Sequence, residues 1–205
     1  MIKRDGLLLV ISGPSGAGKG TICKALLEDD RDIKLSVSAT TRSPREGEVD
    51  GQHYHFVSKD KFKEMIENEE FLEHAQIYDN CYGTPKAKVI ENLKNGVDVV
   101  LEIEMQGAMQ IKKAYPEGIF IFTLPPSLKE LKNRIVGRGT ETAEEIEKRF
   151  SSAFDEINKI KDYDYFVFNN EISNSVKEIK SIITSEKNKV SRYKDNILDK
   201  FREEL

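Results

Sequence analysis

This sequence of 205 residues has only two cysteines, no long apolar run and no excess of basic residues. The two cysteines, Cys23 and Cys81, form neither a framework of bridges nor a pair with metal-ligand spacing, which indicates free thiols in a reducing compartment. No stretch approaches the roughly 18 apolar residues that cross a bilayer, and the run from Leu7 to Ile11 is too short for a signal peptide. We therefore expect a cytoplasmic protein with no membrane attachment.

The charge balance argues against another class of partner. Lys and Arg number 32 against 36 Asp and Glu, a formal net charge of −4. Proteins that bind duplexes usually carry a basic footprint, so non-specific nucleic-acid binding is disfavoured. A few arginines focused in a cleft still suit a small anionic ligand. No sequence feature indicates an obligatory protein partner.

Apolar runs alternate with helical patterns along most of the chain. Short apolar runs predict buried strands at 7–12, 97–103, 119–124 and 165–168, and helical patterns cover 21–28, 59–68, 85–95, 106–114, 127–136 and a segment from 142. One or two further helices carry an apolar stripe, expected to dock on the sheet, formed by Val176, Ile179, Ile183, Val190, Ile197 and Phe201. The alternation predicts an α/β fold, a parallel sheet flanked by helices.

The interval 35–95 breaks this alternation. Its segments 35–41 and 53–57 are short and alternating, which suggests small antiparallel strands around a turn rich in polar residues. We expect a single domain with an inserted sub-domain at about 35–95 and a core of about 1–34, 96–133 and 150–205.

A glycine-rich segment, GPSGAGKGT, lies where the first buried strand meets the first helix. Glycines there let backbone N–H groups converge on an anion, and a lysine can reach the β- and γ-phosphates of a nucleotide. A plain turn with a surface lysine is the alternative. The expected contacts to ATP are Gly13, Ser15, Gly16, Ala17, Gly18, Lys19, Gly20 and Thr21.

The residue after Lys19 departs from the strict pattern of such loops. That pattern has Ser or Thr directly after the lysine, to bind Mg²⁺, whereas here Gly20 precedes Thr21. The Mg²⁺ that accompanies ATP is therefore bound either by Thr21 or mostly through water.

Two further groups of charged residues stand out. Arg42 and Arg45 lie three residues apart around Pro44, and two guanidinium groups on a short loop suit one phosphate, although alone they also fit a solvated charge cluster. Glu102 and Glu104 close the predicted strand at 97–103 and, two residues apart, share one face.

Six motifs follow one another along the chain after the glycine-rich loop: SVSATTRSPREGE, DGQHYHF, EFLEHA, YGT, LEIEMQG and GRGTET. In this order they closely resemble the motifs of guanylate kinases, and the resemblance runs from about residue 7 to about residue 186. The resemblance implies a P-loop NTPase-type sheet, a GMP-binding insertion at 35–95 and a short lid at about 134–149. It also implies direct in-line transfer of the γ-phosphate of ATP, with Mg²⁺, to GMP.

The resemblance implies roles residue by residue. The phosphate of GMP would contact Arg42, Arg45 and Tyr54, with Tyr82 nearby, and guanine would contact Ser38, Glu73, Thr84 and Glu104, where the family usually has Asp. Arg134, Arg138 and Arg149 would belong to the lid, with Arg134 and Arg138 binding ATP, and Asn169 would contact the adenosine of ATP. The catalytic set would be Lys19, Arg42, Arg138 and Arg149.

Glu73 suits guanine for a chemical reason. Guanine displays two adjacent donors, N1–H and the 2-amino group, which one carboxylate accepts together, whereas adenine has an acceptor at N1. Without its flanking motif, Glu73 would equally fit an exposed carboxylate at a helix end. Two other functions stay open: a P-loop kinase acting on another nucleotide such as AMP, and a guanylate-kinase-like binding module without catalysis.

Overall fold

The computed structural model describes residues 4–77, 79–136, 150–151 and 155–202. Its main sheet is parallel, with the order β2-β7-β1-β8-β9. The strands are β2 (Ile33–Leu35), β7 (Asp98–Glu102), β1 (Leu8–Ser12), β8 (Ile119–Leu124) and β9 (Tyr165–Phe168). The predicted parallel α/β fold is confirmed.

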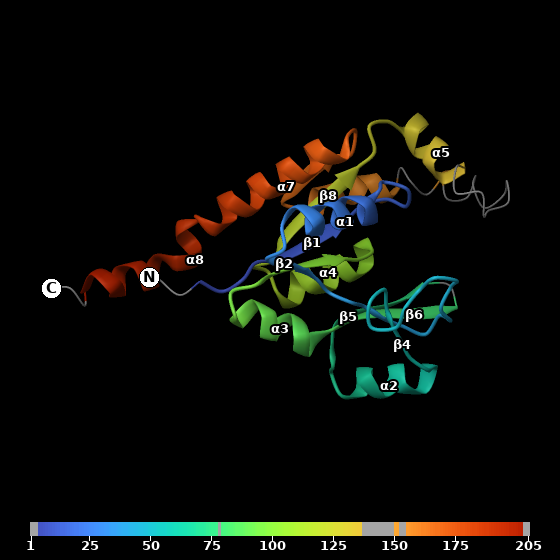
Figure 1. The fold of residues 1–205 in the computed structure, drawn as a ribbon, viewed down its shortest axis with the longest axis horizontal. Helices are drawn as coiled ribbons and strands as arrows, with labels where there is room; N and C mark the ends of the chain where they lie inside the picture. Colours follow the sequence, from blue (N-terminus) through green and yellow to red (C-terminus); the bar gives the residue numbers. More distant parts are fainter. Residues whose placement is uncertain (1–3, 78, 137–149, 152–154, 203–205) are drawn as a thin grey trace.

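Helices cover both faces of this sheet (Figure 1). Every residue of β1 is buried, and alternate side chains point to opposite faces. Leu9 and Ile11 pack with α1 (Lys19–Asp29) and α7 (Ile172–Lys187). Leu8 and Val10 pack with α3 (Lys86–Lys94) and α4 (Met105–Ala114). A strand buried on both sides explains the unbroken apolar run in the sequence.

A second sheet lies beside the first, with the order β4-β3-β6-β5. It contains β3 (Ala39–Thr40), β4 (His55–Phe56), β5 (Phe71–Ile77) and β6 (Asn80–Pro85), with α2 (Lys59–Glu67) between β4 and β5. The expected antiparallel pairing of the first two short strands is wrong, because β3 and β4 are parallel and β3 instead pairs antiparallel with β6. The β5–β6 hairpin had no clear pattern in the sequence.

Two further expectations need correction. Leu35 belongs to β2, an edge strand of the main sheet, and not to a strand of the insertion. The C-terminal stripe docks only as far as Ile183, because the chain breaks into α7 and α8 (Val190–Arg202), and Val190 and Phe201 are 68% and 58% exposed.

The remaining elements connect these layers. The predicted cap of α5 (Leu128–Val136) is confirmed, since Ser127 Oγ accepts a hydrogen bond from Glu130 N at 3.1 Å. A short 3₁₀ helix, η1 (Asn158–Asp162), leads into β9. The helix predicted from 142 lies largely outside the described residues. Within the described part of the chain, no helix is long and apolar enough to cross a membrane.

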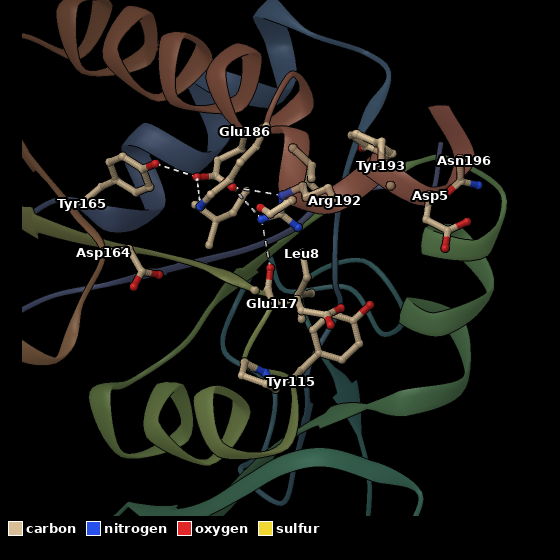
Figure 2. A pocket seen from close by; sticks show the side chains of 17 residues that line it. Asp5, Leu8, Tyr115, Glu117, Asp164, Tyr165, Glu186, Arg192, Tyr193 and Asn196 are labelled. Atoms are coloured by element: carbon tan, nitrogen blue, oxygen red, sulfur yellow. Dashed lines mark hydrogen bonds and ion pairs between the residues drawn. The ribbon is translucent and has the colours of Figure 1, made fainter. Parts of the chain in front are cut away.

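A buried carboxylate joins several elements where the strands of the main sheet begin. Figure 2 shows Glu186, at the end of α7 and 4% exposed, among Tyr165 and Arg192. It accepts hydrogen bonds from Tyr165 Oη at 2.7 Å, Lys189 Nζ at 3.1 Å and Arg192 Nε and Nη2 at 3.0 and 2.7 Å. Arg192 Nη2 also donates to the Glu117 carbonyl. Glu186 thereby ties α7 to β9 and α8, and Arg192 extends the network to the loop before β8.

These hydrogen bonds determine how Glu186 titrates. Burial alone would raise the pKa of Glu186, but the bonds from Tyr165, Arg192 and Lys189 outweigh burial and lower its pKa to about 2. This value lies below the pKa of an unfolded glutamate, about 4.3. The pairing therefore stabilises the fold above that pH, and its contribution is lost as the pH falls towards 2.

We expect Glu186→Gln to lower the free energy of unfolding at pH 7 by about 2 kcal/mol, because a charged acceptor of several bonds is lost. The difference from the unsubstituted protein should shrink as the pH falls below 4. Urea unfolding at several pH values measures it. Glu178→Gln, an exposed position on the same helix, is the matched control; equal losses in both variants would contradict the role of Glu186.

Candidate nucleotide site

The glycine-rich loop joins β1 to α1 at the carboxyl edge of the main sheet. Gly16 and Gly18 have φ of 88° and 90°, which favours glycine, and Gly18 is the N-cap residue of α1. Lys19 folds back over the loop, with Nζ 2.7 Å from the carbonyl oxygen of Gly13. The loop thus presents a helix N-terminus and an ammonium group to the same space, which suits phosphate.

Side chains distant in sequence support the loop from outside. Asn169, 4% exposed, donates from Nδ2 to the Ala17 carbonyl at 2.8 Å. Arg134 Nη2 donates to the Asn169 carbonyl at 3.0 Å, and its Nη1 lies 3.4 Å from the Ala17 carbonyl. Both residues were expected to contact ATP; the structure places their polar groups on the backbone of the loop, and their contact with a nucleotide stays a prediction.

The sequence did not single out Glu156, whose Oε2 accepts a hydrogen bond from Ser15 N at 3.2 Å. The residue stands in the segment that returns from the predicted lid to β9. A carboxylate in this place contacts a backbone N–H of the phosphate loop. No motif in the sequence points to it, because the pairing spans 141 residues.

Two carboxylates face the loop from the end of β7. Glu104 Oε1 lies 3.9 Å from Lys19 Nζ. Glu102, for which no separate role was predicted, lies against Gly20: a Cβ at Gly20 would stand 3.2 Å from Glu102 Oε1. Desolvation in the cleft raises the pKa of Glu102, Lys19 lowers it and Glu104 raises it further. The glycine that departs from the usual loop pattern therefore leaves room for this carboxylate.

Arg42 follows β3 of the small sheet and has a carboxylate, a backbone carbonyl and aromatic rings around it. Its Nη2 donates to Glu48 Oε1 at 2.8 Å and its Nη1 to the Ser43 carbonyl at 2.7 Å. The guanidinium lies 5.5 Å from the ring centroid of Tyr54, whose ring meets that of Tyr82 edge-on at 6.0 Å. The hydrogen bond from Arg42 lowers the pKa of Glu48 to about 2, with help from the backbone of Arg45.

Glu73 is a buried strand residue, not an exposed carboxylate at a helix end. It lies on β5, 6% exposed, and its Oε1 accepts from Thr84 Oγ1 at 2.7 Å. Burial raises its pKa, and hydrogen bonds from Thr84 oppose this only in part. Its other oxygen lies over Gly107 of α4, where a Cβ would overlap with it. The carboxylate is thus fixed by Thr84 and largely desolvated.

Of the other predicted site residues, the structure describes Ser38, Arg45 and Thr21 but not Arg138 and Arg149. Ser38 precedes β3, and its carbonyl accepts from His55 N at 2.9 Å, while Arg45 is exposed in the loop beside Glu48. Thr21 is exposed on the first turn of α1. Arg138 and Arg149 lie outside the described residues. Among the described residues, no group of three or more His, Cys, Asp or Glu could hold a metal ion.

A phosphate loop between the first strand and first helix of a parallel sheet, facing carboxylates at the end of the neighbouring strand, defines a P-loop nucleotide-binding protein. The family model described as guanylate kinase matches residues 6–186. The chain belongs to the guanylate kinase family, and members of that family are nucleoside-monophosphate kinases.

Individual relatives agree. The guanylate kinase of Clostridioides difficile is 71% identical, with each chain covered in full, and that of Caldanaerobacter subterraneus subsp. tengcongensis is 59% identical over 99% of this chain and 98% of its own. The crystal structure of guanylate kinase from Anaplasma phagocytophilum matches with a TM-score of 0.78 at 35% identity, covering 94% of this chain and 92% of that one.

The tight contact at Gly18 leads to a prediction. In Gly18→Ala the new Cβ would overlap with Asn169 Nδ2, so we expect binding of a nucleoside triphosphate to weaken at least about tenfold, because the loop must move. Gly51→Ala is the matched control: it also has a positive φ, 75°, but nothing lies within 4 Å. The control should lose about 1 kcal/mol of stability and keep its affinity.

Isothermal titration with an ATP analogue and thermal unfolding measure the two quantities. Equal loss of affinity in both variants would show that backbone conformation, and not the contact with Asn169, limits binding.

Proposed function

We propose that this protein transfers the γ-phosphoryl group of ATP to GMP, giving ADP and GDP. The observation that carries the proposal is the buried Glu73–Thr84 pair beside the Arg42–Tyr54–Tyr82 cluster on one small sheet. The first can recognise a base and the second a phosphate. The printed names of the relatives, guanylate kinase, support GMP as the acceptor.

The chemistry of Glu73 supports guanine. A fixed carboxylate with one oxygen held by Thr84 keeps lone pairs for the N1–H and 2-amino donors. Adenine would place an acceptor against it and leave a buried charge unpaired, which sites of this kind reject strongly. Ser38 and Glu104 would complete the contacts of the base, and Arg42, Arg45, Tyr54 and Tyr82 those of the phosphate.

On the donor side, the phosphate loop from Gly13 to Thr21 would bind the phosphates of ATP, with Lys19 at the transferred group. Such transfer needs alignment and neutralisation of charge more than covalent chemistry. Lys19 would supply positive charge at the transferred group and Arg42 at the phosphate of GMP, and Arg138 and Arg149 would add theirs from a lid at about 134–149. Arg134 and Asn169 would border the adenosine.

The donor set near the loop fits a Mg²⁺ ion that arrives with ATP. This ion is usually held by one or two oxygen ligands of the protein, substrate phosphates and water. Thr21 stands two residues after Lys19, and Glu102 lies against the intervening Gly20, so the Thr21 hydroxyl and the Glu102 carboxylate would face the ion, mostly through water. Bound Mg²⁺ would neutralise the phosphate oxygens.

Residues 35–95 would then act as the GMP-binding sub-domain of a single guanylate kinase-like domain. The two cysteines, Cys23 and Cys81, are free, which suits the reducing cytoplasm where both nucleotides occur. Neither nucleic acid nor a protein partner is needed for the proposed reaction.

The decisive measurement is ADP release with ATP and each of GMP, dGMP, IMP and AMP. We expect GMP to be the preferred acceptor, and Lys19→Ala to lower kcat by at least about 100-fold, because the charge on the transferred group is no longer neutralised. Lys24→Ala, exposed on the same helix, is the control. A preference for AMP would refute the proposal, and ATP binding without turnover of any acceptor would favour a binding module.

We expect Glu73→Gln to lower kcat/KM for GMP about 100-fold and that for IMP much less, because IMP lacks the 2-amino donor. Since burial raises the pKa of Glu73, GMP binding should weaken on acidification at a higher pH than the ordinary 4.3 of glutamate. The glutamine variant should lack this pH dependence. Titration of both proteins with GMP across pH isolates Glu73, because the phosphate of GMP titrates equally in the two experiments.

A further inference from the structure

Glu73 lies on β5, an edge strand that pairs only with β6 in the described part of the sheet. The backbone groups of successive strand residues point to alternate sides, so an edge strand leaves every second residue with an unpaired N–H and C=O. On β5 the residue next to Glu73, His74, points these groups away from β6 towards α4.

The side chain of Gln110 on α4 satisfies both groups. Its Oε1 accepts from His74 N at 3.2 Å, and its Nε2 donates to the His74 carbonyl at 2.8 Å. A primary amide carries one acceptor and a donor side by side, as a peptide group does. Gln110 therefore continues the ladder of β5 in place of a further strand.

The same face of α4 contacts Glu73 itself. Gly107 lies three residues before Gln110, hence on the same side of the helix. An ideal Cβ at Gly107 would stand 2.9 Å from Glu73 Cδ, so only glycine lets the carboxylate rest on the helix. The register of β5 also shifts between Phe71 and Glu73, a bulge of the kind that redirects a side chain.

α4 links the two parts of the proposed site. It starts directly after Glu104, which faces Lys19, and it belongs to the main sheet's layer through Ala108 and Ile111. The docking of β5 on α4 thus determines where Glu73 stands relative to Glu104 and the phosphate loop.

We propose that Gln110 is a positioning residue for recognition of the base: its amide holds β5 on α4 so that the Glu73 carboxylate faces the acceptor. This inference rests on the proposed function, because Glu73 recognises guanine only if GMP is the acceptor. Gln110 itself does not touch the substrate.

Two substitutions separate hydrogen bonding from packing. Gln110→Met keeps most of the side-chain volume and loses both hydrogen bonds, and Gln110→Glu keeps the acceptor but sets an oxygen against the His74 carbonyl. We expect both to lower kcat/KM for GMP about tenfold, chiefly through KM, and to reduce the preference for GMP over IMP. The KM for ATP should not change. Lys113→Ala, exposed one turn further along α4, is the control.

A double-mutant cycle tests whether Gln110 acts through Glu73. Gln110→Met should cost about tenfold in the unsubstituted protein and little in the Glu73→Gln background, because the carboxylate it positions is gone. Equal cost in both backgrounds, or equal losses for GMP and IMP, would overturn the inference, as would unchanged kinetics. Thermal unfolding of each variant tests whether it is folded at the assay temperature. If Gln110→Met is unfolded there, the cycle is run with Gln110→Glu instead.

The two proposals fail in different ways. If Glu73→Gln leaves the preference for GMP over IMP intact, the role of Glu73 is wrong and that of Gln110 falls with it. If Glu73→Gln erodes the preference and the Gln110 variants do not, only the inference about Gln110 is overturned.

Discussion

The parallel register of β1 between β7 and β8 is the constraint on which the site depends. Ile11 is level with Glu102 on one side, and Ser12 is level with Phe122 on the other. Parallel strands end at the same edge, so the loop after β1 and the carboxylates that end β7 must meet there. Gly13 fits because a Cβ would overlap with the carbonyl of Thr123. The same register brings Glu104, just beyond the end of β7, within 3.9 Å of Lys19 Nζ.

The fold could be predicted from the sequence wherever a pattern repeated. The unbroken apolar runs at β1 and β8 identified strands, and Ser127 identified a helix start. The β5–β6 hairpin was not predicted because its burial is mixed and polar residues such as Glu73 and Thr84 are buried in it, so no apolar alternation marks the strands. The prediction that the C-terminal stripe docks on the sheet was wrong beyond Ile183. The helical periodicity continues through α8, but Val190 and Phe201 of that helix are exposed.

Much of the candidate site could be predicted, but its supporting contacts could not. Lys19, Arg42 and Glu73 stand in motifs whose chemistry is local. Asn169 on the Ala17 carbonyl and Glu156 on Ser15 N connect segments far apart in the chain. Such pairs depend on how the layers of the fold pack together. A side-chain amide or carboxylate that binds a distant backbone group has no characteristic spacing in the sequence, so it cannot be predicted from a motif.

Three of the expected phosphate contacts, Arg42, Lys19 and Ser15, have a carboxylate beside them. Glu48 pairs with Arg42, Glu104 lies near Lys19, and Glu156 accepts from Ser15 N. Under the proposed function, entry of a nucleotide would be an exchange of anions, in which phosphate replaces or joins a resident carboxylate. The net attraction would be the difference between two pairings, so affinity would depend less on salt than in a cleft lined by cations alone. The displaced carboxylates would hold the site in order after the product leaves.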